Sequence, residues 1–287
     1  MPDYLNKSRF RRRFVREFRN PHLGRRVSTY RSNRMGRPRK KIPRTVVPSF
    51  FTLMNLFCGF ISVIQTHQGN YKAAAWLIVL AGLFDLFDGM VARMANATSL
   101  FGVELDSLAD VVSFGLAPSF LVYVFGLEQL HEAGLIIAAL PALAGAVRLA
   151  RFNTDFDGEK HLHFTGLPIP AQALAIVSFI LTFNEIDLNP YFQFGKLSIM
   201  VPLVIILSLL MVSNIKFASL PKPSIRSFRE MPRLWAGYAI CALLILFLHE
   251  IGIFLSMVLY LLTSMVLALV HIIQAIWAET ATSDETT

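Results

Sequence analysis

The sequence is poor in charge and in cysteine, and both shortages narrow the class of protein. Charged residues make up only 16% of the 287 residues. The two cysteines, Cys58 and Cys241, both lie inside apolar runs. Two such cysteines provide neither a disulfide framework nor a metal-ligand spacing, so we interpret them as small core side chains. No β-strand pattern and no internal repeat stands out.

Apolar residues dominate instead. They make up 54% of the chain, and the mean hydropathy is +0.53, as expected for a polytopic membrane protein and not for a soluble domain. The pattern predicts an all-α, polytopic membrane helix bundle of about eight transmembrane helices. We place these helices at residues 48–66, 71–94, 103–126, 133–152, 168–184, 197–215, 234–249 and 251–277.

Basic residues are concentrated in the N-terminal segment. Sixteen of the 27 Lys and Arg residues precede residue 48, and the segment is too long and too basic to be a cleaved signal peptide. Phe10, Phe14 and Phe18 recur every four residues among arginines, which suits a helix on an anionic membrane surface. A disordered basic tail that only sets the topology explains the charge equally well. No nucleic-acid-binding domain accompanies the basic run, so we expect no nucleic-acid partner.

We divide the chain into a basic cytoplasmic tail (1–47), a transmembrane domain (48–277) and a short acidic cytoplasmic tail (278–287). The positive-inside rule favours eight spans with both termini in the cytoplasm. The predicted inside loops carry Lys160, Lys216, Lys222, Arg226, Arg229 and Arg233. The predicted outside loops carry Glu128, Glu132, Glu185 and Asp187, with Lys72 and Lys196 at helix ends.

Four carboxylates lie where the hydropathy predicts membrane: Asp85, Asp88, Asp106 and Asp110. A charge at bilayer depth costs roughly 2.5–3.5 kcal/mol even on lenient insertion scales, and four like charges also repel one another. They therefore need partners, either basic side chains or bound cations. A buried ion network without chemistry is the alternative, but isolated buried charges in membranes are usually functional.

The spacing of the aspartates favours cations. Two are three residues apart and two are four apart, so each pair shares a helix face. A turn at 96–99 would bring the two helices face to face on the cytoplasmic side. Carboxylate oxygens suit Mg²⁺ or Mn²⁺, and four of them could hold two ions, a recurrent arrangement for displacement at phosphorus. Gly89 leaves room for a phosphate, and Arg93 supplies a forked cation for it.

The motif D-x-x-D-G-x-x-A-R-x8-G-x3-D-x3-D resembles the signature of the CDP-alcohol phosphatidyltransferases. Its fixed positions here are Asp85, Asp88, Gly89, Ala92, Arg93, Gly102, Asp106 and Asp110. The resemblance implies that the first three aspartates are metal ligands and that Asp110 is the general base and a further metal ligand. It also implies that Gly89, Arg93 and Gly102 bind the CDP moiety, and that the protein is a homodimer.

Two further groups of polar residues lie in apolar helices. Thr52 and Asn55 share one face of the first span, where a buried amide usually bonds to another helix or to a ligand. Since the first helix faces the nucleotide in the family, both are candidate CDP contacts. Arg148, Arg151 and Asn153 end the fourth span. The arginines either extend toward the interface or, with Asn153, form an anion pocket for the acceptor.

Within the family, the segments TLMNLFCGF, SFGLAPS, RLARFN, GLPIPA and MVSNIKFASLPK are similar to those of membrane-embedded phosphatidylserine synthases. The resemblance implies transfer of the phosphatidyl group of CDP-diacylglycerol to the hydroxyl of L-serine, with CMP released at the cytoplasmic face of the cell (inner) membrane. Another acceptor, such as glycerol 3-phosphate or inositol phosphate, and an ether-lipid donor stay open. A divalent-cation transporter is the alternative from another class, although a cation pathway has no use for Arg93 beside its ligands.

Overall fold

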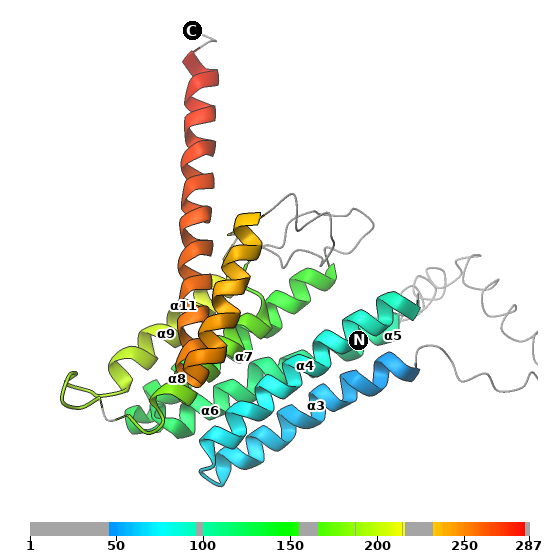
Figure 1. Ribbon diagram of the computed structural model, residues 1–287, viewed down its shortest axis with the longest axis vertical. Coiled ribbons are helices and arrows are strands. Elements are labelled where there is room, and N and C mark those ends of the chain that lie inside the picture. Colours follow the sequence, from blue (N-terminus) through cyan, green and yellow to red (C-terminus); the bar gives the residue numbers. More distant parts are fainter. Residues whose placement is uncertain are drawn as a thin grey trace, which may run out of the picture. The chain divides into compact units, whose positions relative to one another are not determined.

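A computed structural model describes residues 46–95, 100–154, 166–186, 188–213, 215 and 232–284 (Figure 1). The basic tail, the turn at 96–99 and most of the predicted inside loops lie outside these residues. Within the described residues every regular element is a helix, which confirms the all-α prediction. The division of the chain into tail and transmembrane domain stays a prediction.

Each of the eight predicted apolar segments coincides with a helix. The elements are α3 (Val46–His67), α4 (Tyr71–Ala95), α5 (Leu100–Asp110), η1 (Val111–Leu116), α6 (Ala117–Phe125), η2 (Leu127–Leu130), α7 (His131–Thr154), α8 (Ile169–Phe183), α9 (Leu197–Val212) and α11 (Pro232–Asp284). In the described part of the chain, five helical stretches are long and apolar enough to cross a membrane, while α8 and α9 are shorter. The protein is therefore a membrane protein, and the count of eight crossings stays a prediction.

The helix α8 is at the centre of the packing. Ten of its 15 residues are buried, because it contacts α4, α6, α9, α11 and η1. A helix that is apolar on all sides is expected to be buried on all sides, and the sequence of α8 has that character. The neighbouring hairpin of α3 and α4, blue and cyan in Figure 1, packs along its whole length.

Close backbone approach fixes α3 against the η1 segment. A Cβ added to Gly59 would lie 2.7 Å from the Cα of Ser113, so only glycine fits at this crossing. The Ser113 hydroxyl donates a hydrogen bond to the Asn55 carbonyl oxygen at 2.9 Å, one turn away on α3. This contact sets the depth of α3 relative to the residues that follow Asp110.

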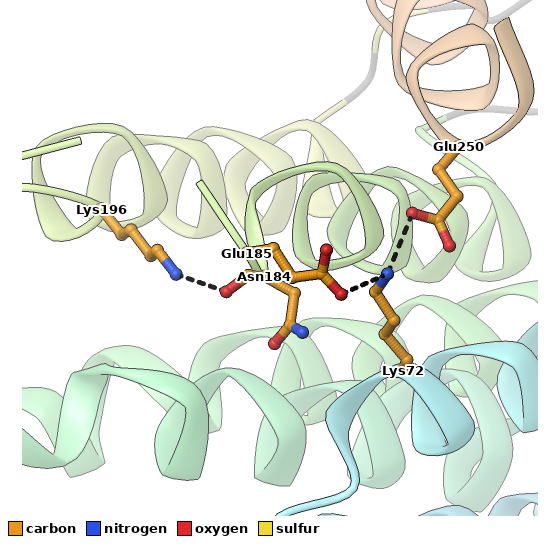
Figure 2. Close-up of polar contacts among 5 residues, drawn as sticks. All are labelled: Lys72, Asn184, Glu185, Lys196 and Glu250. Carbon is orange, nitrogen blue, oxygen red and sulfur yellow. Dashed lines mark hydrogen bonds and ion pairs between the residues drawn. The ribbon is translucent and has the colours of Figure 1, made fainter. Parts of the chain in front are cut away.

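At the other end of the bundle, a lysine joins three helices (Figure 2). Lys72 at the start of α4 pairs with Glu185 at 2.9 Å, just past α8, and with Glu250 of α11 at 3.6 Å. The hydrogen bond from Lys72 lowers the pKa of the Glu185 carboxyl. Nearby, Lys196 donates to the Asn184 carbonyl oxygen at 2.9 Å. The bases expected in the outside loops are thus engaged at helix ends.

Two helix–helix turns share the motif Leu-His-Glu-x-Gly, a repeat that the sequence reading missed. His131 and His249 both have positive φ, 52° and 48°, and a glycine follows three residues later in each turn. A Cβ on Gly134 or Gly252 would collide with the backbone of the preceding helix. The second turn breaks α11 at His249, as the prediction of separate segments 234–249 and 251–277 requires.

We expect His249→Gly to raise the thermal unfolding midpoint of the protein in detergent. A non-glycine residue in the left-handed region costs about 1–3 kcal/mol, which glycine avoids. The matched control is His67→Gly at the end of α3, where positive φ does not occur. That variant should lose stability through lower helix propensity, by roughly 0.3–0.5 kcal/mol. Equal destabilisation by both substitutions would contradict the strain at His249.

Candidate active site

Three of the four aspartates converge in the structure. Asp85 comes from α4, and Asp106 and Asp110 come from α5; one carboxylate oxygen from each lies within 4.8 Å of the others. Asp110 is buried, with 8% of its surface exposed, and the other two are partly buried. The prediction that the two helices bring their aspartates together is confirmed for these three residues.

The fourth aspartate, Asp88, accepts a hydrogen bond from a residue of the first span. Asp88 is 7% exposed and accepts a hydrogen bond from the Thr52 hydroxyl of α3. It lies outside the group of three, yet it is close enough to Asp85 and Asp106 to interact with them electrostatically. Asp88 is thus an adjacent carboxylate on the same face of α4.

Asn55, also on α3, makes a similar hydrogen bond to Asp110, one of the two aspartates of α5. Its side-chain amide donates to the Asp110 carboxylate at 3.1 Å, while its Oδ1 atom is buried without a hydrogen-bond partner among the described residues. Thr52 and Asn55 are one turn apart, so one face of α3 holds one aspartate from each of the two helices. The contact of Asn55 with another helix is therefore confirmed, whereas its contact with a ligand stays a prediction.

The helix changes form directly after Asp110. Residues Val111–Leu116 form a π-helical segment, η1, in which Ser113, Phe114 and Gly115 are buried. π-Helical turns occur mostly as short insertions at functional sites, and they change which face the following turns present. The sequence contained no specific signal for it beyond the run of small residues in SFGLAPS.

The remaining predicted CDP contacts are only partly described. Gly89 is exposed and Gly102 is partly exposed. The side chain of Arg93 lies outside the described part of the structure, as does the turn at 96–99. Their roles in binding the diphosphate stay predictions.

The three candidate acceptor residues at the end of α7 separate in the structure. Asn153 donates to the Ser107 hydroxyl of α5 at 3.1 Å, and Arg151 contacts the Val212 carbonyl oxygen at 3.4 Å. Arg148 is within electrostatic range of Asp110, and its Nε atom is buried without a partner in the described residues. Of the two arginines, Arg148 is therefore the one beside the aspartates.

The aspartate cluster fits a divalent metal. Its donors are all carboxylate oxygens, the ligands that Mg²⁺ and Mn²⁺ prefer. The ion pairs of Lys72 with Glu185 and Glu250 form at the far end of α4, away from the aspartate cluster. Close carboxylates in apolar surroundings repel one another unless a cation or a proton compensates them.

Comparison with known proteins agrees with this geometry. Residues 45–211 match the family described as CDP-alcohol phosphatidyltransferase. The chain belongs to the CDP-alcohol phosphatidyltransferase family. It is 36% identical over 180 residues to the CDP-diacylglycerol–serine O-phosphatidyltransferase of Helicobacter pylori, an alignment that covers 63% of this chain and 75% of the relative.

Two further relatives extend the comparison. The enzyme of the same name from Bacillus subtilis is 37% identical over 177 residues, covering 61% of this chain and 92% of the relative. The archaetidylserine synthase of Methanothermobacter thermautotrophicus is 36% identical over 181 residues, covering 62% of this chain and 72% of the relative. The family match includes every aspartate of the cluster and ends before α11.

Removal of divalent metal should abolish the transferase activity of this family member. The reason is that the converging carboxylates repel one another when no cation is bound. Release of CMP from CDP-diacylglycerol, measured after chelation and again after adding Mn²⁺ or Mg²⁺, checks this.

Calorimetric titration with Mn²⁺ tests whether the ion binds at the aspartate cluster. Asp106→Asn should weaken Mn²⁺ binding at least tenfold, on the order of the loss of one charged ligand. Glu132→Gln, in the turn before α7, is the matched control and should leave binding unchanged. Full activity after exhaustive chelation would exclude a metal role for the cluster.

Proposed function

We propose that the protein transfers the phosphatidyl group of CDP-diacylglycerol to the hydroxyl of L-serine, which gives phosphatidylserine and CMP. The convergence of Asp85, Asp106 and Asp110 on the family signature supports the reaction class. The names of the bacterial relatives support serine as acceptor. The archaeal relative is named for a serine lipid with a different donor, so serine is the shared substrate and the lipid is the more variable one.

Asp85, Asp88 and Asp106 would hold the metal, with Asp110 as a further ligand, and we expect two ions of Mg²⁺ or Mn²⁺. When bound, these ions supply electrostatic stabilisation to the diphosphate and to the departing CMP. Three ligand positions are within reach of one another, and Thr52 orients the fourth carboxylate. Gly89, Gly102 and Arg93 would bind the diphosphate from the exposed side.

Asp110 acts as the general base in this proposal. It takes the proton of the serine hydroxyl as the serine oxygen forms a bond to the phosphorus of the phosphatidyl group. The bond between that phosphorus and the oxygen of CMP breaks, and CMP leaves with the electron pair. The hydrogen bond from Asn55 orients the Asp110 carboxylate, because it occupies one of its oxygens.

Asp110→Asn should lower turnover at least about a hundredfold, the usual scale of general-base loss, with a far smaller change in CDP-diacylglycerol affinity. Asn55→Leu should lower turnover about tenfold, because it leaves the base without its orienting donor. Ser62→Ala is the matched control on α3, since the Ser62 hydroxyl donates to the Ala74 carbonyl oxygen and to none of the aspartates. Near-normal turnover of the Asp110 variant would assign the proton transfer to another group.

Arg148 is the preferred partner for the serine carboxylate. Its guanidinium lies in range of Asp110, and its buried Nε is available for a forked pair of bonds. Arg151 and Asn153 bond to other helices, to Val212 and Ser107, and would support the pocket wall. A carboxylate bound to Arg148 would place the serine hydroxyl toward the general base.

We expect Arg148→Lys to raise the KM for serine about tenfold or more, because lysine cannot reproduce the planar fork. Arg151→Lys, the matched control, should have a smaller effect, and neither variant should alter CDP-diacylglycerol binding much. Product identity is measured with serine, glycerol 3-phosphate and inositol phosphate offered in parallel. Consumption of a phosphorylated acceptor with serine ignored would retain the family reaction and reject serine. Metal transport without CMP release would instead favour the cation-transporter alternative.

For the membrane arrangement we propose eight spans with both termini in the cytoplasm and the aspartates near the cytoplasmic face of the cell (inner) membrane. The helix positions and the loop charges support this, and cytosolic serine requires it. A homodimer is expected from the family resemblance.

A reporter fused after residue 287 should therefore be cytoplasmic, and a reporter inserted near Asn189 should be external. Asn189 lies in the connection between α8 and α9, at the end of the bundle where Lys196 bonds to Asn184. Enzymatic activity of the reporters in whole cells, with a fusion at residue 1 as a second cytoplasmic control, measures the topology. The reverse pattern would put the aspartates on the side away from cytosolic serine.

A further inference from the structure

The second half of α11 packs against the catalytic bundle although it lies beyond the residues that match the family. The match ends at residue 211, whereas α11 begins at Pro232. The centroid of the Phe254 ring lies 6.4 Å from that of the Phe179 ring of α8 and 5.4 Å from that of the Phe183 ring. The Thr182 hydroxyl also donates to the Glu250 carbonyl oxygen at 3.3 Å. The helix therefore runs back along α8 from the turn at His249.

These contacts set the register of the two helices. Glu250 is level with Thr182, and Phe254 is level with Phe179, so the two chains run in opposite directions. Continuing the same register toward the aspartate end places Tyr260 beside the first turns of α8, level with Gln172. Tyr260 is partly buried and packs against the core, as this placement requires.

Gln172 is an unusual residue in its position. It is fully buried, with 0% of its surface exposed, and neither Nε2 nor Oε1 has a hydrogen-bond partner among the described residues. Buried polar groups in native proteins are nearly always paired, and one without a protein partner indicates a water or a ligand. An amide retained in such an apolar helix therefore points to something that binds there.

Arg148 connects this region to the catalytic aspartates. It lies within electrostatic range of both Asp110 and Tyr260. One turn earlier on α7, a Cβ added to Gly145 would lie 3.2 Å from the Ile169 Cγ1 atom, so the Ile169 side chain at the start of α8 packs over Gly145. Gln172 follows on α8 one turn after Ile169. Polar groups from α5, α7, α8 and α11 thus border one region.

We propose that Tyr260 and Gln172 form the side of the acceptor pocket that binds the ammonium group of serine. This proposal rests on serine being the acceptor, with its carboxylate on Arg148. An ammonium has three donors and needs acceptors, and the phenol oxygen and the amide oxygen are both neutral acceptors. The tyrosine ring can add a cation–π contact. Neutral acceptors also leave the metal ions on the carboxylates, whereas a further aspartate here would compete for them.

The first experiment compares Tyr260→Phe and Gln172→Leu with the wild type. Each should raise the KM for serine about tenfold, while the KM for CDP-diacylglycerol stays within about twofold. Tyr123→Phe is the matched control, because Tyr123 is also partly buried against the core but lies on α6. Gln172→Leu should keep or raise the thermal midpoint, since it removes an unpaired polar group from an apolar site. A lower midpoint with unchanged serine KM would overturn the proposal in favour of a packing role.

The second experiment uses 3-hydroxypropionate, which has the hydroxyl and the carboxylate of serine but no ammonium. The wild type should prefer serine over this analogue in kcat/KM, and both variants should lose about tenfold of that preference. Arg148→Lys should weaken both acceptors and keep the preference. If the Tyr260 and Gln172 variants lose both acceptors equally, the ammonium assignment is wrong although serine synthesis stands. If the wild type makes no phosphatidylserine at all, the proposed function itself fails.

Discussion

The structure depends on carboxylates held close together within apolar helices. Each would be costly alone at bilayer depth, and together they repel, so the fold must supply compensation. Part of it comes from α3, where Thr52 and Asn55 donate to Asp88 and Asp110. A cation or a proton can supply the rest, and the oxygen-only ligands of the cluster suit the divalent metals that this family uses.

The end of the bundle opposite the aspartates is stabilised by aromatic contacts and ion pairs. There the Phe179, Phe183 and Phe254 rings and the ion pairs of Lys72 join α4, α8 and α11. Exposed ion pairs contribute little, so the ring contacts and the buried face of α8 supply most of the stability. Strong apolar packing at this end lets the aspartate end keep repelling charges and unpaired polar atoms.

The last helix, α11, packs along α8 from one end of the bundle toward the other. Its outer contacts with α8 set its register, and that register determines which of its residues come near Arg148. In the proposed arrangement, a helix outside the family-matched residues shapes the acceptor side of the pocket, while α3, α4 and α5 would form the nucleotide side. Such a division would allow one catalytic centre to serve different acceptors.

Much of this protein could be predicted from its sequence. Length and periodicity located all eight helical segments, because apolar runs of that size have few other stable forms. Spacing alone placed Asp85, Asp106 and Asp110 on facing helices. Thr52 and Asn55 were recognised as polar residues on one face, but their partners were not identifiable, since a helix face does not specify which helix it meets.

Tertiary structure decided the rest. It separated Arg148 from Arg151, which are equivalent in sequence, because a difference of three residues turns one toward Asp110 and leaves the other beside Val212. It revealed the π-helical segment after Asp110 and the repeated turns at His131 and His249, which depend on backbone geometry that periodicity does not report. It also showed that the Gln172 side chain is buried without a hydrogen-bond partner among the described residues. Sequence therefore determined the chemistry of the site through residue type and spacing, whereas the neighbours of each polar group followed from how the helices pack.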